Sequence, residues 1–213
     1  MPSPSLLFET RTYRDKTSST AAFYHAPMDG ITWAASAMSA ARARLDAAAE
    51  NLANSSVDGF RKTQLRGFLD ASGIVMQRLR SASQGPLRHT GRPYDLAIVG
   101  AGAFRVRDAN GRIVQTRCGS FTRDRFGHLV DGAGRMLLGM RGPVRAAGGA
   151  IERIPLPRGS TVRTGFLEGS NADAIGEMID VLTAQRSFET AQKVLSAIDQ
   201  TRERATTQVA QMK

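Results

Sequence analysis

Two regions near the ends of the chain carry apolar residues at seven-residue intervals, and this spacing limits the possible folds more than any other feature. The first region pairs larger apolar residues with alanines three positions later: Ile31, Met38, Leu45 and Leu52, with Ala34, Ala41 and Ala48. An a/d heptad repeat among strong helix formers predicts an amphipathic helix with one narrow apolar seam. The turn-forming residues Ser55-Ser56 and Asp58-Gly59 follow, so we expect this helix to end near Asn54.

The second region repeats the pattern close to the other end. Two series share the seven-residue spacing: Phe188, Leu195, Arg202 and Val209, and Ala191, Ile198, Ala205 and Met212. An earlier apolar stripe passes through Ile175, Met178 or Ile179, and Leu182, which predicts a change of register near Gln185. Ser170 or Asn171 can serve as the N-cap, and Asp173 places negative charge in the first turn. We therefore predict one helix from Asn171 to Lys213, about 64 Å long.

A helix of that length projects beyond a compact chain of this size, whose radius of gyration is roughly 17 Å. Its apolar seam therefore needs a partner that runs alongside it. One solution is an intramolecular hairpin of the two terminal helices. The other is subunit assembly, in which the terminal helices of many copies form a shared coiled-coil wall; a repeated heterologous contact of this kind gives a helical filament or tube. The heptads alone leave both arrangements open.

Between the helices, short β-prone runs alternate with glycine-containing turns. The runs are Tyr94–Val99, Phe104–Arg107, Ile113–Arg117, Ser120–Arg123, His128–Val130 and Met136–Leu138. Asn110-Gly111 is a strong hairpin signal, because both central residues of a type I′ turn need positive φ. The connections leave no room for crossover helices, which excludes a parallel sheet. The predicted fold class is α+β: N- and C-terminal helices forming a coiled-coil-like assembly region, with a small antiparallel β domain inserted between them.

This pattern divides the chain into five segments. Residues 1–27 are polar and aperiodic, so we interpret them as a disordered leader outside the functional protein, with Met28 as the candidate natural start. The other segments are the N-terminal helix and its turn (28–60), a linker (61–85), the inserted β domain (86–165) and the long C-terminal helix (166–213).

The net charge of +10 is concentrated in the centre of the chain. Residues 86–170 contain fourteen arginines, no lysine and six acidic residues, whereas residues 28–60 and 171–213 are slightly acidic. The arginines are dispersed, which is typical of a solvated face. An excess of basic charge on one domain also indicates a polyanionic partner, so a nucleic-acid-binding module built on the Arg-rich β domain is the alternative function.

Two glycine-containing segments invite a comparison with ligand-binding loops. Gly100-Ala-Gly102 follows a strand as a dinucleotide turn would, but Arg105 stands where the third glycine is needed and a strand follows instead of a helix. Asp108-Ala-Asn110-Gly111 resembles the start of a calcium loop, but Gly119 occupies the twelfth position, where such a loop needs glutamate. Neither segment predicts a ligand site.

The remaining reactive side chains form no catalytic or metal-binding pattern. Cys118 is the only cysteine, which excludes an intrachain disulfide, and His25, His89 and His128 are too scattered to complete a zinc site with it. We therefore expect no enzyme, no metal and no cofactor. No run approaches 18 apolar residues, so we expect no membrane span. No secretory signal precedes Met28, which leaves a cytoplasmic protein or one exported by another route.

Three groups of residues, in order along the chain, resemble the signatures of the flagellar rod, hook and hook-associated axial proteins. The N-terminal group is Ala49-Glu-Asn51-Leu-Ala-Asn54 with Gly59-Phe60-Arg61-Lys62, the central group is 84–98 and 116–130, and the C-terminal group is 165–171, Glu177-Met178 and 184–189. They are spread in this order over most of residues 28–200. The chain departs from the pattern at Ala101 and Ala103, and in the short stretch of about 25 residues between Gly139 and Gly165.

The resemblance implies a structural, non-enzymatic subunit of the bacterial flagellar basal-body rod, which transmits torque to the hook and serves motility. It also implies unfolded export through the flagellar type III apparatus without a cleaved signal peptide. The expected partners are other copies, other rod and hook axial proteins, the export apparatus and basal-body ring proteins, with no nucleic acid. The expected subunit-interface residues are Ile31, Met38, Leu45, Asn51, Leu52, Asn54, Gly59, Phe60, Glu168, Asn171, Met178, Leu182, Gln185, Arg186, Phe188, Leu195 and Ile198.

Overall fold

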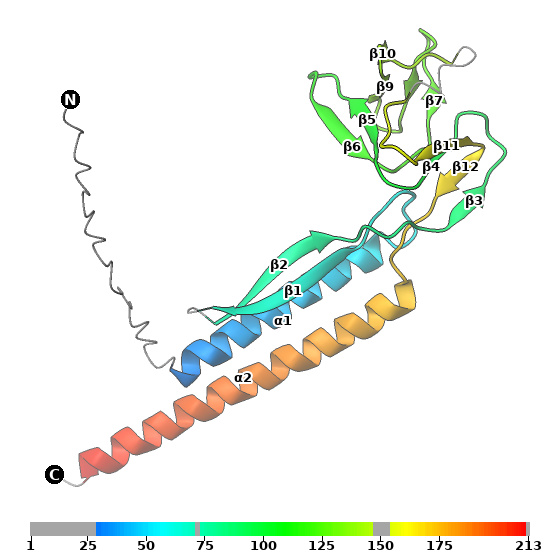
Figure 1. The fold of residues 1–213 in the computed structure, drawn as a ribbon. Helices are drawn as coiled ribbons and strands as arrows, with labels where there is room; N and C mark the ends of the chain where they lie inside the picture. Colours follow the sequence, from blue (N-terminus) through cyan, green and yellow to red (C-terminus); the bar gives the residue numbers. More distant parts are fainter. Residues whose placement is uncertain (1–28, 71–72, 147–153, 212–213) are drawn as a thin grey trace, which may run out of the picture.

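The computed structural model describes residues 29–70, 73–146 and 154–211. It has an N-terminal helix, a central antiparallel β region and a C-terminal helix, as the sequence predicts. The two helices lie side by side, a β-hairpin lies along the N-terminal helix, and the remaining strands gather at one end of the helices (Figure 1). The predicted leader, residues 1–27, falls outside the described residues.

Helices α1 (Gly30–Ala53) and α2 (Ala174–Gln211) pack against each other in antiparallel directions. Gly30 near the start of α1 lies beside Ile198, while Asn51 near its end bonds to Glu177 of α2. The alanines Ala34, Ala41 and Ala48 of α1 and Ala184 and Ala191 of α2 are all buried. Small side chains let the two helix backbones approach closely. The helical hairpin that the sequence left open as one arrangement is therefore present in the single chain.

The side of α2 that packs on α1 differs from the predicted stripe. Its buried and half-buried residues alternate at intervals of four and three: Glu177, Val181, Ala184, Phe188, Ala191, Leu195 and Ile198. This seam runs without interruption, so the predicted register change near Gln185 is wrong. The apolar residues that suggested the change lie on another face and are exposed: Ile175 (71%), Met178 (54%), Ile179 (58%) and Leu182 (57%). The apolar pattern of the sequence did not reveal this seam, because a glutamate, Glu177, occupies its first position.

Helix α2 extends past the start of α1. The two helices have 38 and 24 residues, which correspond to about 57 Å and about 36 Å. At the end of the overlap Arg202 donates hydrogen bonds to the carboxylate of Asp29, and this interaction lowers the pKa of Asp29 below its usual value. Every described residue beyond Arg202 is exposed, so the last turns of α2 have no partner within the described chain (Figure 1).

Within residues 61–85, predicted as a linker, the structure has two paired strands. Strands β1 (Thr63–Asp70) and β2 (Gly73–Arg80) pair antiparallel along their whole length, from Thr63 opposite Arg80 to Asp70 opposite Gly73. The hairpin packs on α1, which thus lies between the hairpin and α2 (Figure 1). The sequence did not indicate these strands because most of their residues are exposed, so it shows only a short apolar run at 74–76.

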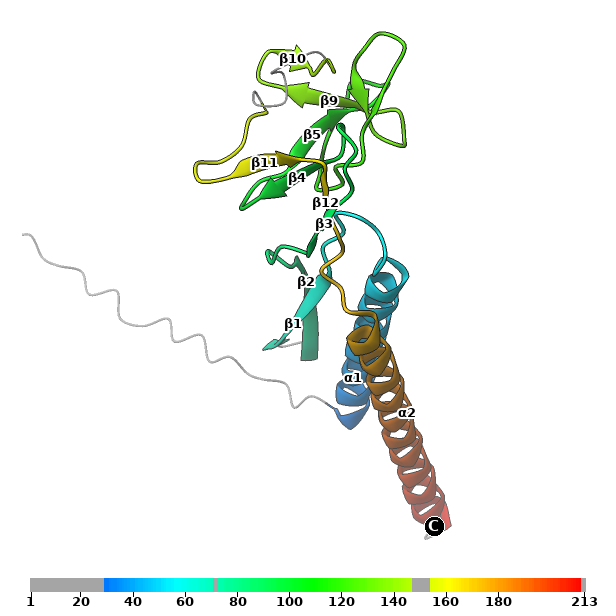
Figure 2. The same cartoon turned by 90° about the vertical axis from the view of Figure 1, so that its right-hand side faces the viewer.

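Strands β3 to β12 form the β domain. They are β3 (Leu87–His89), β4 (Leu96–Val99), β5 (Phe104–Arg107), β6 (Ile113–Thr116), β7 (Thr122–Arg123), β8 (Leu129–Val130), β9 (Met136–Gly139), β10 (Gly142–Pro143), β11 (Thr161–Thr164) and β12 (Phe166–Glu168). The main sheet has the order β6-β5-β9-β8-β7, with β10 on β9, and the pairs β4–β11 and β3–β12 lie between it and the helices (Figure 2). All described pairings are antiparallel.

One apolar core holds the β domain together. Its fully buried members include Leu96, Ile98, Phe104, Val106, Leu129 and Leu137, and the rings of Phe104 and Phe121 meet edge to face at 5.5 Å. The predicted β5–β6 hairpin is present, but its loop spans residues 108–112 and is longer than the two-residue type I′ turn. Gly111, at φ +81°, donates to the carbonyl of Asp108 and closes this turn. In the described part of the chain, no helix is long and apolar enough to cross a membrane.

Candidate assembly interface

The predicted site residues divide between two places. Asn51, Gly59, Glu168 and Asn171 meet where the chain passes from the helices to the β domain. We call this meeting point the junction; it comprises Asn51, Gly59, Arg61, Lys62, Arg117, Glu168, Asn171 and Glu177. Most of the other predicted residues lie on the two helices.

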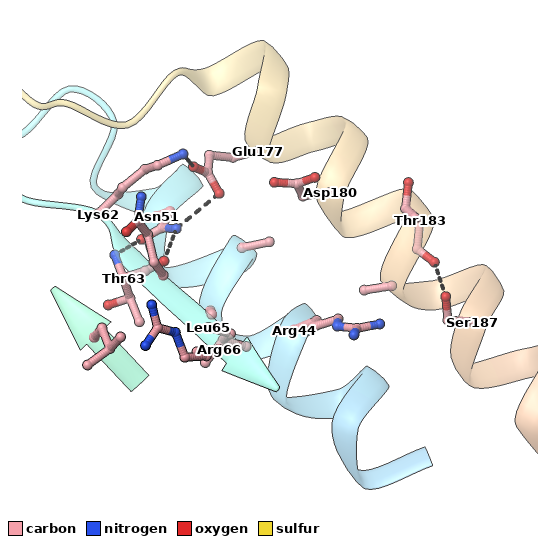
Figure 3. Close-up of a pocket in the computed structure, with 15 residues that line it drawn as sticks. Arg44, Asn51, Lys62, Thr63, Leu65, Arg66, Glu177, Asp180, Thr183 and Ser187 are labelled. Atoms are coloured by element: carbon pink, nitrogen blue, oxygen red, sulfur yellow. Dashed lines mark hydrogen bonds and ion pairs between the residues drawn. The ribbon is translucent and has the colours of Figure 1, made fainter. Parts of the chain in front are cut away.

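Asn51 binds three elements together at the helical side of the junction. Its Oδ1 accepts the backbone N–H of Thr63 at 2.7 Å, and its Nδ2 donates to the Thr63 carbonyl at 2.9 Å and to Glu177 Oε2 at 3.0 Å (Figure 3). Lys62 Nζ lies 3.4 Å from the other Glu177 oxygen. The Asn51 side chain thus bonds to the Thr63 backbone as a neighbouring strand would. It also supplies a hydrogen-bond donor to the buried carboxylate of Glu177.

A buried ion pair holds the β-domain side of the junction. Arg117 Nη1 lies 2.7 Å from Glu168 Oε2, and the two side chains are 4% and 1% exposed. Arg117 also donates to the carbonyls of Ile98, Gly100 and Gly102. The other Glu168 oxygen accepts the Gly85 N–H at 3.3 Å and lies 3.6 Å from Arg61 Nη2. Each side chain of this buried pair thus has its counter-charge and further hydrogen-bond partners, and this is the arrangement in which a buried ion pair is tolerated.

Asn171 has a different role from the predicted one. Its Oδ1 accepts the Lys62 N–H at 2.7 Å, and its Nδ2 donates to the Ser83 carbonyl at 2.8 Å, so the side chain joins the start of α2 to both ends of the hairpin. The residue that caps α2 is Asp173, whose carboxylate accepts the N–H groups of Ile175 and Gly176. The predicted capping by Ser170 or Asn171 is therefore wrong, because tertiary bonds engage Asn171 and α2 begins three residues later.

Gly59 brings the turn after α1 into backbone contact with the β domain. Its N–H donates to the Glu168 carbonyl at 2.6 Å, its φ is +73°, and a Cβ at this position would lie 2.2 Å from the Cys118 nitrogen. We expect Gly59→Ala to lower the free energy of unfolding by about 2–4 kcal/mol, since the left-handed conformation and the backbone clash both oppose a side chain. Urea denaturation followed by circular dichroism measures the change.

Gly111→Ala is the matched control for this substitution. Gly111 has a similar φ of +81°, but open space surrounds the position of its missing Cβ. Only the conformational penalty of about 1–2 kcal/mol then applies. Equal losses for the two variants would contradict the close packing of Gly59 against Cys118.

The predicted interface residues differ in what they contact within the chain. Asn51 and Glu168 are buried and bond within the chain, so in the single chain their side chains build the junction. Ile31, Met38, Leu45, Leu52, Phe188, Leu195 and Ile198 lie half-buried on the two helices, and Asn54, Gly59, Phe60 and Asn171 are half-buried around the junction. Met178, Leu182, Gln185 and Arg186 are exposed on α2. These last four are the residues most accessible to a neighbouring molecule.

Two of these exposed residues, Met178 and Leu182, belong to a group of exposed apolar side chains. Ile175, Met178, Ile179 and Leu182 are each more than half exposed and occupy two turns near the start of α2. We call these four residues the outer stripe. Their spacing of three, one and three residues places them on one side of the helix. The stripe therefore offers a helix face that can pack against a further helix.

A groove of about 490 Å³ opens between α1, β1 and α2, and it is lined by α2 residues outside the outer stripe. Small residues line its base, including Ala47, Ala48 and Ala184, and the hydroxyl of Ser187 donates to the Thr183 carbonyl (Figure 3). Arg44, Arg66 and Asp180 stand around it. Such a wall of small side chains suits packing against another polypeptide. Over the described residues, no group of His, Cys, Asp or Glu side chains is placed to hold a metal ion.

Segments that resembled ligand loops have structural functions. The carbonyls of Gly100 and Gly102 accept hydrogen bonds from Arg117, so this turn presents acceptors to a guanidinium and not N–H groups to a phosphate. Asp108 Oδ1 accepts the N–H of Arg112 and shapes the β5–β6 turn. Arg117, Lys62 and Glu177 all lie within the sequence segments that resemble the family signatures. Only their tertiary contacts identify them as residues of the junction.

Comparisons with known protein families match most of the chain. Residues 31–61 match the family described as "Flagella basal body rod protein", residues 97–168 match "Flagellar hook protein FlgE/F/G D1 domain", and residues 163–208 match "Flagellar basal body rod FlgEFG protein C-terminal". The matched segments correspond to α1 and its turn, the β domain, and α2 with its preceding strands.

Individual relatives give the same result. The rod protein FlgF of Caulobacter vibrioides is 30% identical over 213 residues, covering 72% of this chain and 86% of that protein. The rod protein FlgG of Agrobacterium fabrum is 24% identical, covering 81% of this chain and 96% of the relative. The hook protein FlgE of Brucella abortus biovar 1 is 39% identical over 125 residues, but the alignment covers only 31% of that protein. These matches give no support to a nucleic-acid-binding module.

Proposed function

Because the chain belongs to the flagellar basal-body rod and hook protein family, as a structural subunit and not an enzyme, we propose that it builds its part of the rod through the outer stripe of α2 and the adjoining faces of its terminal helices.

One observation carries this proposal. Helix α2 already packs on α1 through its seam, yet a second face exposes the four apolar residues of the outer stripe. Isolated exposed apolar residues are ordinary on a monomer, whereas a group of large ones on one helix face marks an interaction site. A helix from a neighbouring subunit would remove this surface from water.

The unequal lengths of the helices support a repeated arrangement. The α1–α2 pair presents the outer stripe near one end and the unpartnered last turns of α2 at the other. Contacts between such different surfaces are heterologous, and they generate an open helical array when they do not close into a ring. In our proposal the helices of many copies form the wall of the axial tube, with the β domain on its outside. This coiled-coil-like wall transmits torque to the hook.

Membership of the family also suggests a route of export and specific protein partners. We expect the chain to be exported unfolded by the flagellar type III apparatus without a cleaved signal peptide, and to assemble with other rod and hook axial proteins in the cell-envelope part of the basal body. Basal-body ring proteins are candidate neighbours of the β domain. These expectations rest on the family alone.

Deleting the gene in the source bacterium tests the proposed function. We expect non-motile cells whose purified basal bodies lack a complete rod and hook in electron micrographs, and restoration of both by the full chain expressed from a plasmid. Complete rods with attached hooks in the deletion strain would contradict the proposal.

A further inference from the structure

The turn between β7 and β8 exposes an aromatic ring beside arginine side chains. Phe126 is 64% exposed, although large apolar side chains usually avoid water at a turn. The guanidinium carbon of Arg125 lies 4.7 Å from the centre of its ring, and the ring of His128 lies 6.5 Å away. The arginine thus covers one side of Phe126 and adds a positive charge to an apolar surface.

Two more arginines approach the same turn. The Nε of Arg123 lies 3.7 Å from the position where Gly127 would carry a Cβ. Arg145 pairs with His128 in an isolated β-bridge, and the next residue, Ala146, donates its N–H to the Gly127 carbonyl. We call Arg123, Arg125, Phe126 and Arg145 the Arg–Phe turn. All four residues are exposed.

The carboxylate nearest to these arginines is already engaged. Asp124 Oδ1 accepts the N–H groups of Phe126 and His128 at 2.8 and 2.7 Å, and Oδ2 lies 3.4 Å from His128 Nδ1. Partial burial would raise the pKa of Asp124, but the hydrogen bonds from His128 and Phe126 outweigh it and lower the pKa. Among the ion pairs of the described residues, none includes Arg123, Arg125 or Arg145.

The composition of the surface indicates the class of partner. Every basic residue in 86–170 is arginine, and none is lysine. Arginine and phenylalanine are enriched and lysine is depleted in the buried centres of protein–protein interfaces. The planar guanidinium also matches the two oxygens of a carboxylate. The guanidinium pairs equally well with phosphate, so the exposed ring of Phe126 is what favours a protein partner, because a phosphate polymer offers the ring no apolar counterpart.

We propose that the Arg–Phe turn is a docking site for an acidic protein surface, with partner carboxylates on the guanidiniums and an apolar partner side chain or pocket on Phe126. This inference goes beyond assembly through the helices, because the turn belongs to the β domain and shares no residue with the outer stripe.

Binding of the full chain to labelled acidic polypeptides tests the proposal. Fluorescence anisotropy at physiological salt compares poly-L-glutamate with a random glutamate–tyrosine copolymer. We expect the copolymer to bind more tightly, because tyrosine supplies a ring for Phe126. The variant R125Q/F126A should weaken copolymer binding about tenfold, which corresponds to about 1.4 kcal/mol.

The matched control is R112Q/I113A, which removes one exposed arginine and one exposed apolar residue from the β5–β6 hairpin. We expect less than a twofold change in copolymer affinity. Far-ultraviolet circular dichroism and thermal unfolding check that both variants fold as the unchanged chain does. The single variant F126A should reduce the preference for the copolymer over poly-L-glutamate.

Three results would overturn the proposal. Equal losses in the two double variants would show that diffuse positive charge alone governs binding. Tighter binding to vesicles of anionic phospholipid or to polyphosphate than to the copolymer would assign the turn to a lipid or phosphate partner. Absence of binding of the unchanged chain to either polypeptide would remove the acidic docking site.

Discussion

Replacing Ile179 and Leu182 with glutamate should abolish motility while leaving the isolated chain folded. Both residues belong to the outer stripe and are 58% and 57% exposed, so their replacement removes little packing within the chain. Surface substitutions of this kind usually change stability by less than about 0.5 kcal/mol. In an assembled rod the same two carboxylates would be buried against an apolar surface without partners, which costs several kcal/mol for each contact, or about a thousandfold or more in affinity.

Swimming assays in a complemented deletion strain and electron microscopy of basal bodies measure this effect. The control is I113E/M140E, which places the same two charges on apolar residues of the β domain that are 47% and 75% exposed. Cells carrying the control should swim. If I179E/L182E also restored normal swimming and complete rods, the outer stripe would not be an assembly surface.

Glu168→Ala should lower the free energy of unfolding by about 3–5 kcal/mol. The substitution leaves the Arg117 guanidinium buried with carbonyl acceptors but without its carboxylate. It also removes the acceptor of the Gly85 N–H and the anion near Arg61. Urea unfolding monitored by circular dichroism gives the free energy, and a lower denaturation midpoint with an unchanged slope identifies a loss of stability.

Two further variants separate the buried pair from its surroundings. Arg88→Ala removes an exposed pair, since Arg88 lies 3.3 Å from Asp58 with 66% of its side chain accessible, and should cost less than about 1 kcal/mol. The double variant R117A/E168A should lose less stability than the sum of the two single variants, because no unpaired charge remains. A loss below about 1 kcal/mol for Glu168→Ala, or strict additivity, would show that the pair does not stabilise the junction.

The local features of the fold were accessible from sequence patterns. Heptad spacing located both helices, because alanines at every seventh residue of α1 face a partner. The short β runs matched observed strands, since the buried residues Phe104 and Val106 alternate with arginines along β5. Glycine marked the turns of the β domain. These signals depend on neighbours in the sequence, so they do not require knowledge of the tertiary contacts.

The missed features depend on contacts between distant residues. The seam of α2 includes Glu177, which is acceptable inside the protein only because Asn51 and Lys62 lie beside it. The hairpin β1–β2 exposes most of its residues and is held against α1, so its sequence resembles a polar connection. Asn171 has the chemistry of a helix cap, but the Lys62 N–H and Ser83 carbonyl occupy its amide.

The candidate site shows the same division. Family signatures identified Asn51, Gly59, Glu168 and Asn171 as important, but their position in the sequence did not distinguish an internal role from an external one. Asn51 and Glu168, at 3% and 1% exposure, make their contacts within the chain. The outer stripe, by contrast, was visible as an apolar pattern, and only the packing of α1 on the other face of α2 shows that it is free.

The junction has a mechanical consequence for the link between the helices and the β domain. The segments that leave α1 and enter α2 bond to each other through their backbones, from Gly59 N–H to the Glu168 carbonyl and from Asn171 N–H to the Phe60 carbonyl. Side-chain contacts of Glu168 with Arg61 and with the Gly85 N–H cross the same boundary. Twisting the β domain against the helices must shear several short bonds at once. These contacts therefore oppose rotation of the β domain against the helices, and Glu168 takes part in each of them except the Asn171–Phe60 bond.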